Sequence, residues 1–378
     1  MNIVQGMSAA TCGAQAVQEA VANWSSTPDI VFALCSATQD PQDVVQALNE
    51  RFPDVVIAGC TTSGEHLDGQ HYRNAVVLTG VCNSGIEWAT RRVTGLAEFT
   101  AKQAETLIKG LFADLGTTPD DVESDEFFSM LFIDGLSTKE ESVSAFIDSA
   151  LCGVHMAGGS AGDDLAFSQT QVLHADGAST DAFVLVMGKK NGTPVEIMKH
   201  QHFIGSDTSL VITKADPAER RVYEIDGYPA TTAYAAAIGR TPEELDGDAT
   251  FLHPVTLGYK GELYVRSIQK LHDDGSITFF CAIEEGMVLD IGSHTDMASA
   301  LSKDLAAVQS RMGNIPFLFG FNCILRAIEA DGAGAHEQLG QVFKQSCDNM
   351  IGFDTYGEQL DGLHMNQTLV AVAFGEAT

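Results

Sequence analysis

The sequence predicts an α/β protein of two domains, built from repeated β-α-β units that form mixed sheets. Three observations lead to this prediction. Short β-branched runs alternate with amphipathic stretches along the chain, which is the pattern of α/β folds. The chain has 378 residues, enough for two domains that each bury a core. A polar glycine turn recurs at related places in this alternation.

The strands are predicted from apolar runs that are bounded by turn residues, and the helices from apolar residues at helical spacing. The predicted strands are Ile30–Cys35, Val55–Ala58, Ala75–Val81, Phe128–Phe132, Ala182–Met187, Ile277–Ile283, Pro316–Gly320 and Thr368–Phe374. The predicted helices are Gln15–Asn23, Pro41–Glu50, Ala101–Leu115, Lys139–Ala150, Thr231–Ile238, Met297–Met312 and Glu337–Ser346.

These elements form a unit that recurs three times, over residues 1–82, 85–188 and 286–376. Each unit contains a turn in which a hydroxyl residue is followed by any residue, a glycine and an acid. The three copies are Thr62-x-Gly64-Glu65, Ser160-x-Gly162-Asp163 and Thr355-x-Gly357-Glu358. A repeat of this length indicates duplicated domains. Either the turn stabilises itself through its own hydroxyl and carboxylate, or these groups face a ligand at the strand ends.

Residues 189–285 interrupt the repeat. Within them, a strand through Glu224 and Ile225 is predicted to lead into a helix that starts near Pro229, because proline favours the first helical turn. We therefore predict a domain boundary near residue 190, with domains 1–189 and 190–378.

Composition excludes some classes of function. The chain has 21 basic and 51 acidic residues, a formal net charge of −30, and no basic run, which argues against binding to nucleic acid or to an anionic membrane. Eight scattered cysteines without metal-ligand spacing indicate reduced thiols and no metal site. The sequence has neither a signal-peptide pattern nor an apolar run long enough to span a bilayer. We expect a soluble, cytoplasmic protein.

The third unit carries the candidate ligand site. A predicted strand leads into a loop that contains Cys323 and Arg326, and the carboxyl ends of strands are where open α/β sheets place ligands. If the strands pair as the repeat suggests, Arg326 lies near the turn of Thr355, Tyr356, Gly357 and Glu358. Arg326 then either pairs with Glu358 or holds a ligand carboxylate in bidentate fashion.

These residues resemble a known family. The segments Asn322-Cys323-x-x-Arg326, Ile351-Gly352-Phe353-x-x-Tyr356-Gly357-Glu358 and Asn366-Gln367-Thr368-Leu369 are similar to the C-terminal half of FIST proteins, as is Ile225-Asp226-Gly227-Tyr228-Pro229-Ala230. The first two glycine turns resemble the N-terminal half. The chain departs from the family at Met365, where many members have a histidine, and has His364 one residue earlier.

The resemblance implies a sensory protein that binds a small molecule or a gas. Cys323, Arg326, Thr355, Tyr356, Gly357, Glu358 and Asn366 are then the ligand-binding candidates. No transmitter, receiver or GGDEF-like segment occurs, so the resemblance implies a standalone input subunit that regulates a histidine kinase or a cyclic-di-GMP enzyme. Whether the chain forms a homo-oligomer is left open.

One branch of the family senses nitric oxide through haem. We therefore expect a haem-based sensor, with haem b as its cofactor. Haem needs an axial ligand in an apolar pocket, and the candidates are His200, His202 and His364; the first two alternate along a predicted strand. The alternative is a sensor of a small polar metabolite such as an amino acid, without haem. A hydrolase that uses Cys323 is less favoured, because no motif of a nucleophilic enzyme accompanies it.

Overall fold

The computed structural model describes residues 1–259 and 261–376, which form two compact units. The large unit comprises Met1–His200, Ser302–His364 and Leu369–Thr378, and the small unit comprises Gln201–Leu301 and Met365–Thr368. The boundary predicted near residue 190 falls inside the first segment of the large unit. The prediction of an α/β protein with mixed sheets is confirmed.

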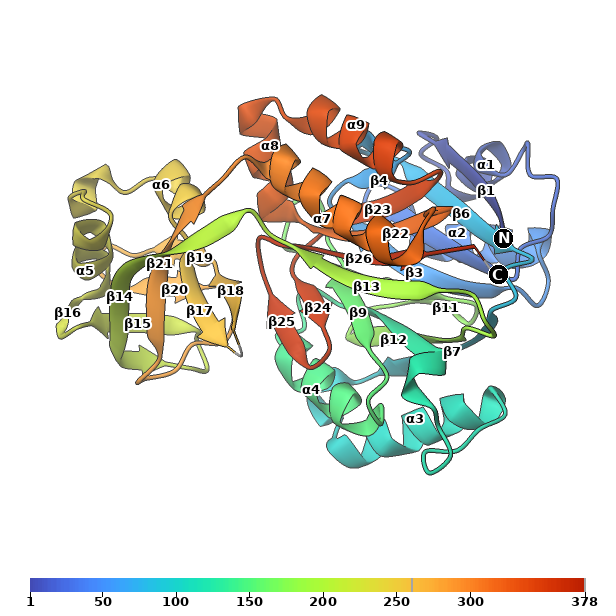
Figure 1. Cartoon of the computed structure of the whole chain (residues 1–378), viewed down its shortest axis with the longest axis horizontal. Helices are drawn as coiled ribbons and strands as arrows, with labels where there is room; N and C mark the ends of the chain where they lie inside the picture. The colour runs from blue at the N-terminus through green and yellow to red at the C-terminus, as the bar shows by residue number, and fades with distance from the viewer. Residues whose placement is uncertain (260, 377–378) are drawn as a thin grey trace. The chain divides into compact units, whose positions relative to one another are not determined.

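The large unit contains three six-stranded sheets with the same topology. Figure 1 labels many of their strands. The first sheet has the order β1 (Asn2–Ser8), β6 (Val76–Cys82), β2 (Ile30–Ser36), β3 (Val56–Thr62), β10 (Val172–His174), β11 (Gly177–Ser179). The second has the order β7 (Glu87–Thr94), β12 (Ala182–Lys189), β8 (Phe127–Ile133), β9 (Met156–Ser160), β24 (Glu358–Leu360), β25 (Leu363–Met365). The third has the order β13 (Val195–His200), β26 (Leu369–Phe374), β22 (Phe317–Cys323), β23 (Met350–Thr355), β4 (Glu65–Leu67), β5 (Gln70–Tyr72).

Each sheet has one central parallel pair, namely β2/β3, β8/β9 and β22/β23, and its other pairs are antiparallel. The last two strands of every sheet are a hairpin that comes from another repeat. The hairpin of the first repeat, β4–β5, completes the third sheet; β10–β11 completes the first; and β24–β25 completes the second. This cyclic exchange joins the repeats into one unit and explains why the large unit takes strands from both ends of the chain.

Helices cover one face of the sheets, and phenylalanines fill the other. Helices α1 (Gly13–Ala20) and α2 (Pro41–Arg51) pack on the first sheet, and α3 (Ala101–Asp114) and α4 (Glu140–Ala150) pack on the second. Helix α8 (Ile324–Ala333) contacts β22 and β23, and α9 (His336–Ser346) contacts β5. On the opposite face, the Phe32 ring lies 6.4 Å from that of Phe132 and 4.9 Å from that of Phe319. Because neighbouring residues of a strand face opposite ways, each strand contributes to both cores.

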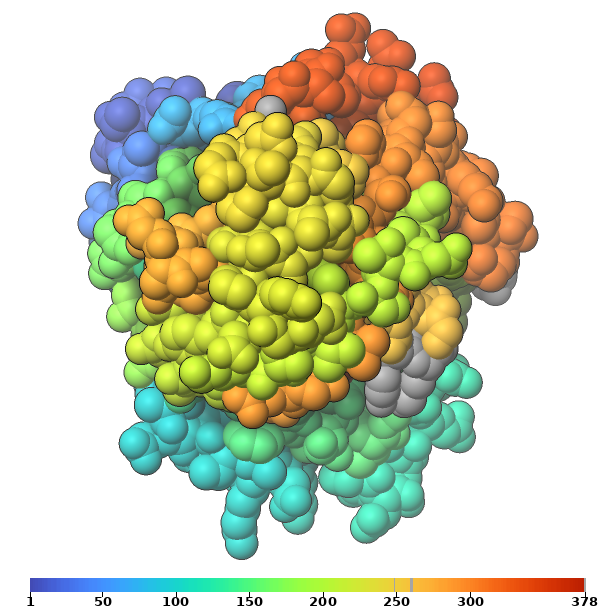
Figure 2. Space-filling view, turned by 90° about the vertical axis from the view of Figure 1, so that its left-hand side faces the viewer, coloured from blue at the N-terminus to red at the C-terminus, as the bar shows by residue number. Residues whose placement is uncertain are grey.

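The small unit is one antiparallel sheet with two helices, and part of its surface is yellow and yellow-green in Figure 2. Its strand order is β18 (Glu262–Arg266), β17 (Val255–Tyr259), β21 (Val288–His294), β14 (Phe203–Asp216), β15 (Arg221–Ile225), β20 (Ile277–Phe279), β19 (Ile268–Leu271), with β16 (Tyr228–Pro229) beside β15. Its helices are α5 (Ala230–Ala237) and α6 (Gly247–Leu252), and α7 (Met297–Met312) begins in this unit. Short 3-10 turns lie at Leu96–Glu98, Ser124–Glu126 and Pro242–Glu244.

Three predictions about local structure differ from the fold. The third repeat takes its first strand from β13 rather than from residues after 286, because β21 pairs with β14 and β17 in the small unit. Arg326 lies in the first turn of α8 rather than in a loop, because this helix buries an apolar side that includes Ile324, Leu325 and Ala327. The strand predicted at Ile277–Ile283 ends at Phe279.

Candidate functional site

The carboxyl ends of the three parallel strand pairs carry polar side chains that are buried. Such strand ends are the usual ligand position in α/β sheets. We name seven residues at these ends the strand-end cluster: Ser36, Ser63, Glu65, Asp163, Asp164, Asp354 and Tyr356. All except Asp164 and Tyr356 are buried in the structure.

Hydrogen bonds join members of the cluster from different repeats. The Asp164 amide donates to Ser63 Oγ at 3.0 Å, and Ser36 Oγ donates to Asp164 Oδ2 at 3.2 Å. The Tyr356 hydroxyl donates to the Asp163 carboxylate and accepts the Leu165 amide at 2.8 Å. The first, second and third repeats therefore meet in one polar network.

Asp163 organises the loop that follows β9. Its carboxylate accepts the amides of Phe167, Ser168 and Gln169 at 3.0, 2.7 and 2.9 Å. Burial alone would raise the pKa of Asp163, but the bonds from Tyr356 and the three amides outweigh it and hold the pKa below its ordinary value. The Phe167 ring stacks on Tyr356 at 5.0 Å. The loop is thus fixed by a carboxylate that stays ionised.

Glu65 has an oxygen with no hydrogen-bond partner among the described residues. Its side chain is 0 % exposed, the Thr62 hydroxyl donates to Oε1, and the Ala75 amide also acts on this carboxyl and lowers its pKa, whereas Oε2 is buried without a hydrogen bond of ordinary geometry to a described residue. Burial raises the pKa of Glu65 to about 8, and the nearby Asp164 and Asp354 carboxylates add to the rise. Buried carboxyl oxygens normally have partners, so Glu65 is the residue of the cluster that is ready to bind one.

Asp354 accepts three hydrogen bonds inside the unit. His66 Nε2 lies 2.7 Å from Oδ1, His71 Nε2 lies 2.8 Å from Oδ2, and Asn322 Nδ2 donates to Oδ1 at 2.7 Å. Burial would raise the pKa of this carboxyl, but the two histidines outweigh burial and hold the pKa well below its ordinary value. Gly64 has φ +150°, and a Cβ there would clash with this carboxylate, so the turn requires glycine.

Several residues predicted for the site meet at the ends of β22 and β23. Thr355 Oγ1 donates to Glu358 Oε1 at 2.6 Å and accepts the Gly357 amide at 3.1 Å. Arg326 is 2 % exposed, and its Nε donates to Asn322 Oδ1 at 3.0 Å. Burial lowers the pKa of Arg326, which the carboxylates of Glu329 and Glu358 oppose. Cys323 ends β22 and is also buried.

The same hydroxyl-to-acid bond stabilises the first and third turns, at Thr62–Glu65 and Thr355–Glu358. In the second turn, Ser160 Oγ instead accepts Gln359 Nε2 at 3.0 Å. The hydroxyl and the carboxylate of the first and third turns therefore stabilise the turn itself, which is one of the two interpretations of the repeat.

The histidines predicted to bind haem have these surroundings. His200 Nδ1 lies 2.7 Å from Asp304 Oδ2, and His364 Nδ1 lies 3.0 Å from Gln359 Nε2. His202 and Asn366 belong to the small unit, where the His202 ring packs on Phe203 at 4.3 Å. A haem ligand needs one ring nitrogen directed into an apolar pocket. The assignment of His200, His202 and His364 as haem ligands stays a prediction.

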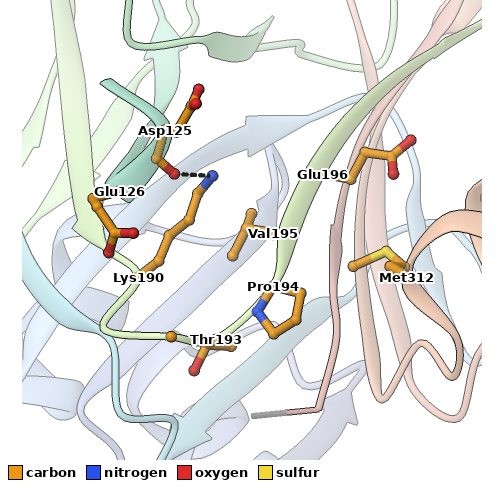
Figure 3. A pocket seen from close by; sticks show the side chains of 9 residues that line it. Asp125, Glu126, Lys190, Thr193, Pro194, Val195, Glu196 and Met312 are labelled. Carbon is orange, nitrogen blue, oxygen red and sulfur yellow. Dashed lines mark hydrogen bonds between the residues drawn. The ribbon is translucent and has the colours of Figure 1, made fainter. Parts of the chain in front are cut away.

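Two pockets of about 310 and 370 Å³ lie at the amino end of β8, opposite to the strand-end cluster. They share Asp125, Lys190, Val195 and Glu196. In Figure 3, the Lys190 ammonium group points to the backbone carbonyl of Asp125, to which it donates at 2.8 Å. Neither pocket is lined by a residue that the sequence predicted for the site.

Sequence reasoning missed Asp354, His66 and the role of Asp163. The sequence held one indication of Asp354. When the first and third turns are aligned, Asp354 replaces Thr61, just as Tyr356 replaces Ser63. The hydrogen bond between His66 and Asp354 joins residues 288 positions apart, a separation at which local pattern carries no information.

The structure combines a repeated α/β unit with buried polar side chains at its strand ends. The chain belongs to the FIST family: the model of the FIST N domain matches residues 29–228, and that of the FIST C domain matches residues 230–361. FIST domains are sensory domains of signal transduction that bind small ligands. No curated protein matches the chain. In the described part of the chain, no helix combines the length and apolarity needed to cross a bilayer.

Proposed function

We propose that this chain is a cytoplasmic sensor that binds a small polar ligand with an amino group at the strand-end cluster. One observation carries the proposal: Glu65 Oε2 is fully buried, has no partner among the described residues, and lies where the three repeats meet. A ligand N–H donor at this oxygen would satisfy it, since an unsatisfied buried acceptor costs about 1–3 kcal/mol.

The charge of the cluster favours an amine over an anion. The carboxylates of Asp164 and Asp354 lie near Glu65, and both raise its pKa. An ammonium group would be attracted by these charges and would lower the pKa of Glu65, so that Glu65 releases its proton to solvent as the ligand binds. Arg326, at the ends of the same strands, is the predicted partner of a ligand carboxylate. Amino acids carry both groups and are the first class to test.

The sensor then regulates a separate signalling enzyme, a histidine kinase or a cyclic-di-GMP enzyme. Support for this step comes from the family, whose domains act in signal transduction. Ligand binding changes the network that joins three repeats, including the Tyr356 bonds to Asp163 and Leu165. A change in this network can alter the surface that a partner recognises.

A thermal-shift screen of amino acids, amines and carboxylates tests the proposal. We expect an amine-bearing ligand to raise the melting temperature of the wild-type chain, because a ligand of the folded state stabilises it. We expect Glu65→Gln to abolish this shift. Glu358→Gln is the matched variant, because Glu358 accepts from Thr355 as Glu65 does from Thr62.

Two outcomes would refute the proposal. A shift that survives Glu65→Gln and is lost in Glu358→Gln would move the ligand to the third turn. A visible haem spectrum that responds to nitric oxide, recorded on protein purified with haem supplied, would replace the polar ligand by haem-based sensing.

A further inference from the structure

Two histidines lie directly opposite each other on the β4–β5 hairpin. His66 and His71 form a cross-strand pair, and their ring centroids are 4.8 Å apart. Directly opposed side chains on one face of a hairpin are near enough to interact. The side chains are 13 % and 10 % exposed, so solutes reach them although Asp354 beneath them is fully buried.

The two rings and the Asp354 carboxylate converge on one small region. Both histidines approach the carboxylate through Nε2, at 2.7 and 2.8 Å, and the three ligand atoms all lie within 4.8 Å of one another. Tetrahedral zinc with bonds of about 2.0–2.1 Å separates its ligand atoms by about 3.3 Å. One metal ion would replace the two bridging protons if the 2.7 and 2.8 Å contacts lengthen by about half an ångström and the two Nε2 atoms, which lie within 4.8 Å of each other, approach to about 3.3 Å.

A second group of candidate ligands adjoins the first on the exposed side. The His336 ring stacks on His71 at 4.3 Å with an interplanar angle of 2°. His336 Nε2 lies 2.8 Å from Asp331 Oδ1, and these residues form a second set of ligand atoms with His71. His336 and Asp331 thus add an imidazole and a carboxylate to the three inner groups, His66, His71 and Asp354.

The backbone is built for this convergence. Gly64 leaves no room for a side chain beside Asp354 and His71, and the backbones of Gly69 and Gly340 are in contact. The second contact holds the turn of the β4–β5 hairpin against α9, the helix that begins at His336. Both close approaches require glycine, since a Cβ at either place would meet backbone or a buried carboxylate.

We propose that His66, His71 and Asp354 bind a divalent first-row transition metal of the zinc class, with His336 and Asp331 next to it. Two imidazoles and a carboxylate suit Zn²⁺ or Fe²⁺, whereas Mg²⁺ and Ca²⁺ prefer oxygen ligands alone. Metal binding requires the histidines to give up the protons that they share with Asp354. The site goes beyond the proposed sensory function and does not depend on it.

Titration with Co²⁺ tests the proposal, because the visible absorption of bound Co²⁺ reports its coordination. The exposed Cys12 and Cys152 are first replaced by serine, so that thiolates do not contribute. We expect one equivalent to bind to chelator-treated protein. His66→Gln and His71→Gln should each weaken binding by about 100-fold or more, the upper end of what supporting residues of metal sites contribute.

His155→Gln is the matched control, because His155 also pairs with an aspartate, Asp361, at 3.1 Å. It should bind Co²⁺ as the wild type does. Two results would overturn the metal site: no stoichiometric binding by the wild type, or equal binding by all three variants. The melting temperature of each variant without metal shows whether that variant folds. If a variant does not fold, the titration of the wild type alone tests the metal site.

Discussion

Replacing Glu65 by glutamine should make the chain more stable than the wild type, and this difference in the free energy of unfolding should grow as the pH rises. Glutamine keeps the shape of the side chain and an oxygen for the Thr62 hydroxyl, but it cannot ionise. In the wild type, burial raises the pKa of Glu65 from 4.5 to about 8. The folded chain therefore retains this proton at pH values where the unfolded chain has released it.

The size of the effect follows from linkage. Between pH 4.5 and 8 the unfolded state binds fewer protons at this site than the folded state, so the free energy of unfolding falls as the pH rises. Each pKa unit corresponds to about 1.4 kcal/mol. From pH 5 to pH 9 the wild type should lose about 4 kcal/mol relative to Glu65→Gln.

Urea unfolding of both proteins, at several pH values across this range, measures the difference. Comparison with the variant at each pH cancels the contribution of the other titrating groups. The same measurements on Glu50→Gln, at an exposed glutamate, serve as the control. A Glu65→Gln difference that stays constant from pH 5 to pH 9 would refute the argument, because Glu65 would then be ionised in the folded chain.

Three further substitutions test the turns by urea unfolding at neutral pH. Gly64→Ala should destabilise by at least about 2 kcal/mol, since it combines a strained φ with a clash against Asp354; an unchanged stability would show that the turn adapts. Thr355→Val removes a buried hydroxyl that donates at 2.6 Å and should cost about 1–3 kcal/mol, whereas no loss would make the turn chemistry dispensable. Tyr356→Phe removes the donor to Asp163 and should cost a similar amount. Because Asp163 has a lowered pKa, this last difference should shrink as acid protonates the carboxylate, and a constant difference would contradict the assignment.

The alternation of strands and helices and the repeat could be predicted because central strands are recognisable in the sequence as apolar runs. The runs at β2 and β8 are buried at every position, and their predicted bounds differ from the observed ones by a residue at the ends. The exchanged hairpins were not predictable in this way. Strands of three residues such as β4 and β24 have too little pattern to reveal their partners, and those partners lie in other repeats.

The candidate site was predicted where its chemistry is local and missed where it is not. The Thr355–Glu358 bond spans three residues, so the turn motif alone indicated it. The partners of Tyr356 and the two histidines that bond Asp354 are more than 190 positions away. Glu65 was visible in the motif, but its burial and free oxygen result from the pairing of β4 with β23 of the third repeat.

Hydrogen–deuterium exchange with the ligand from the thermal-shift screen tests the central claim most directly, since it locates the ligand without a variant. Amides of loops and turns exchange through local opening, which a bound ligand suppresses. We expect slower exchange at 61–66, 160–170 and 354–358 together, one segment from each repeat. Slower exchange confined to 124–128 and 190–197, the segments that line the two pockets, would contradict a ligand site at the strand-end cluster.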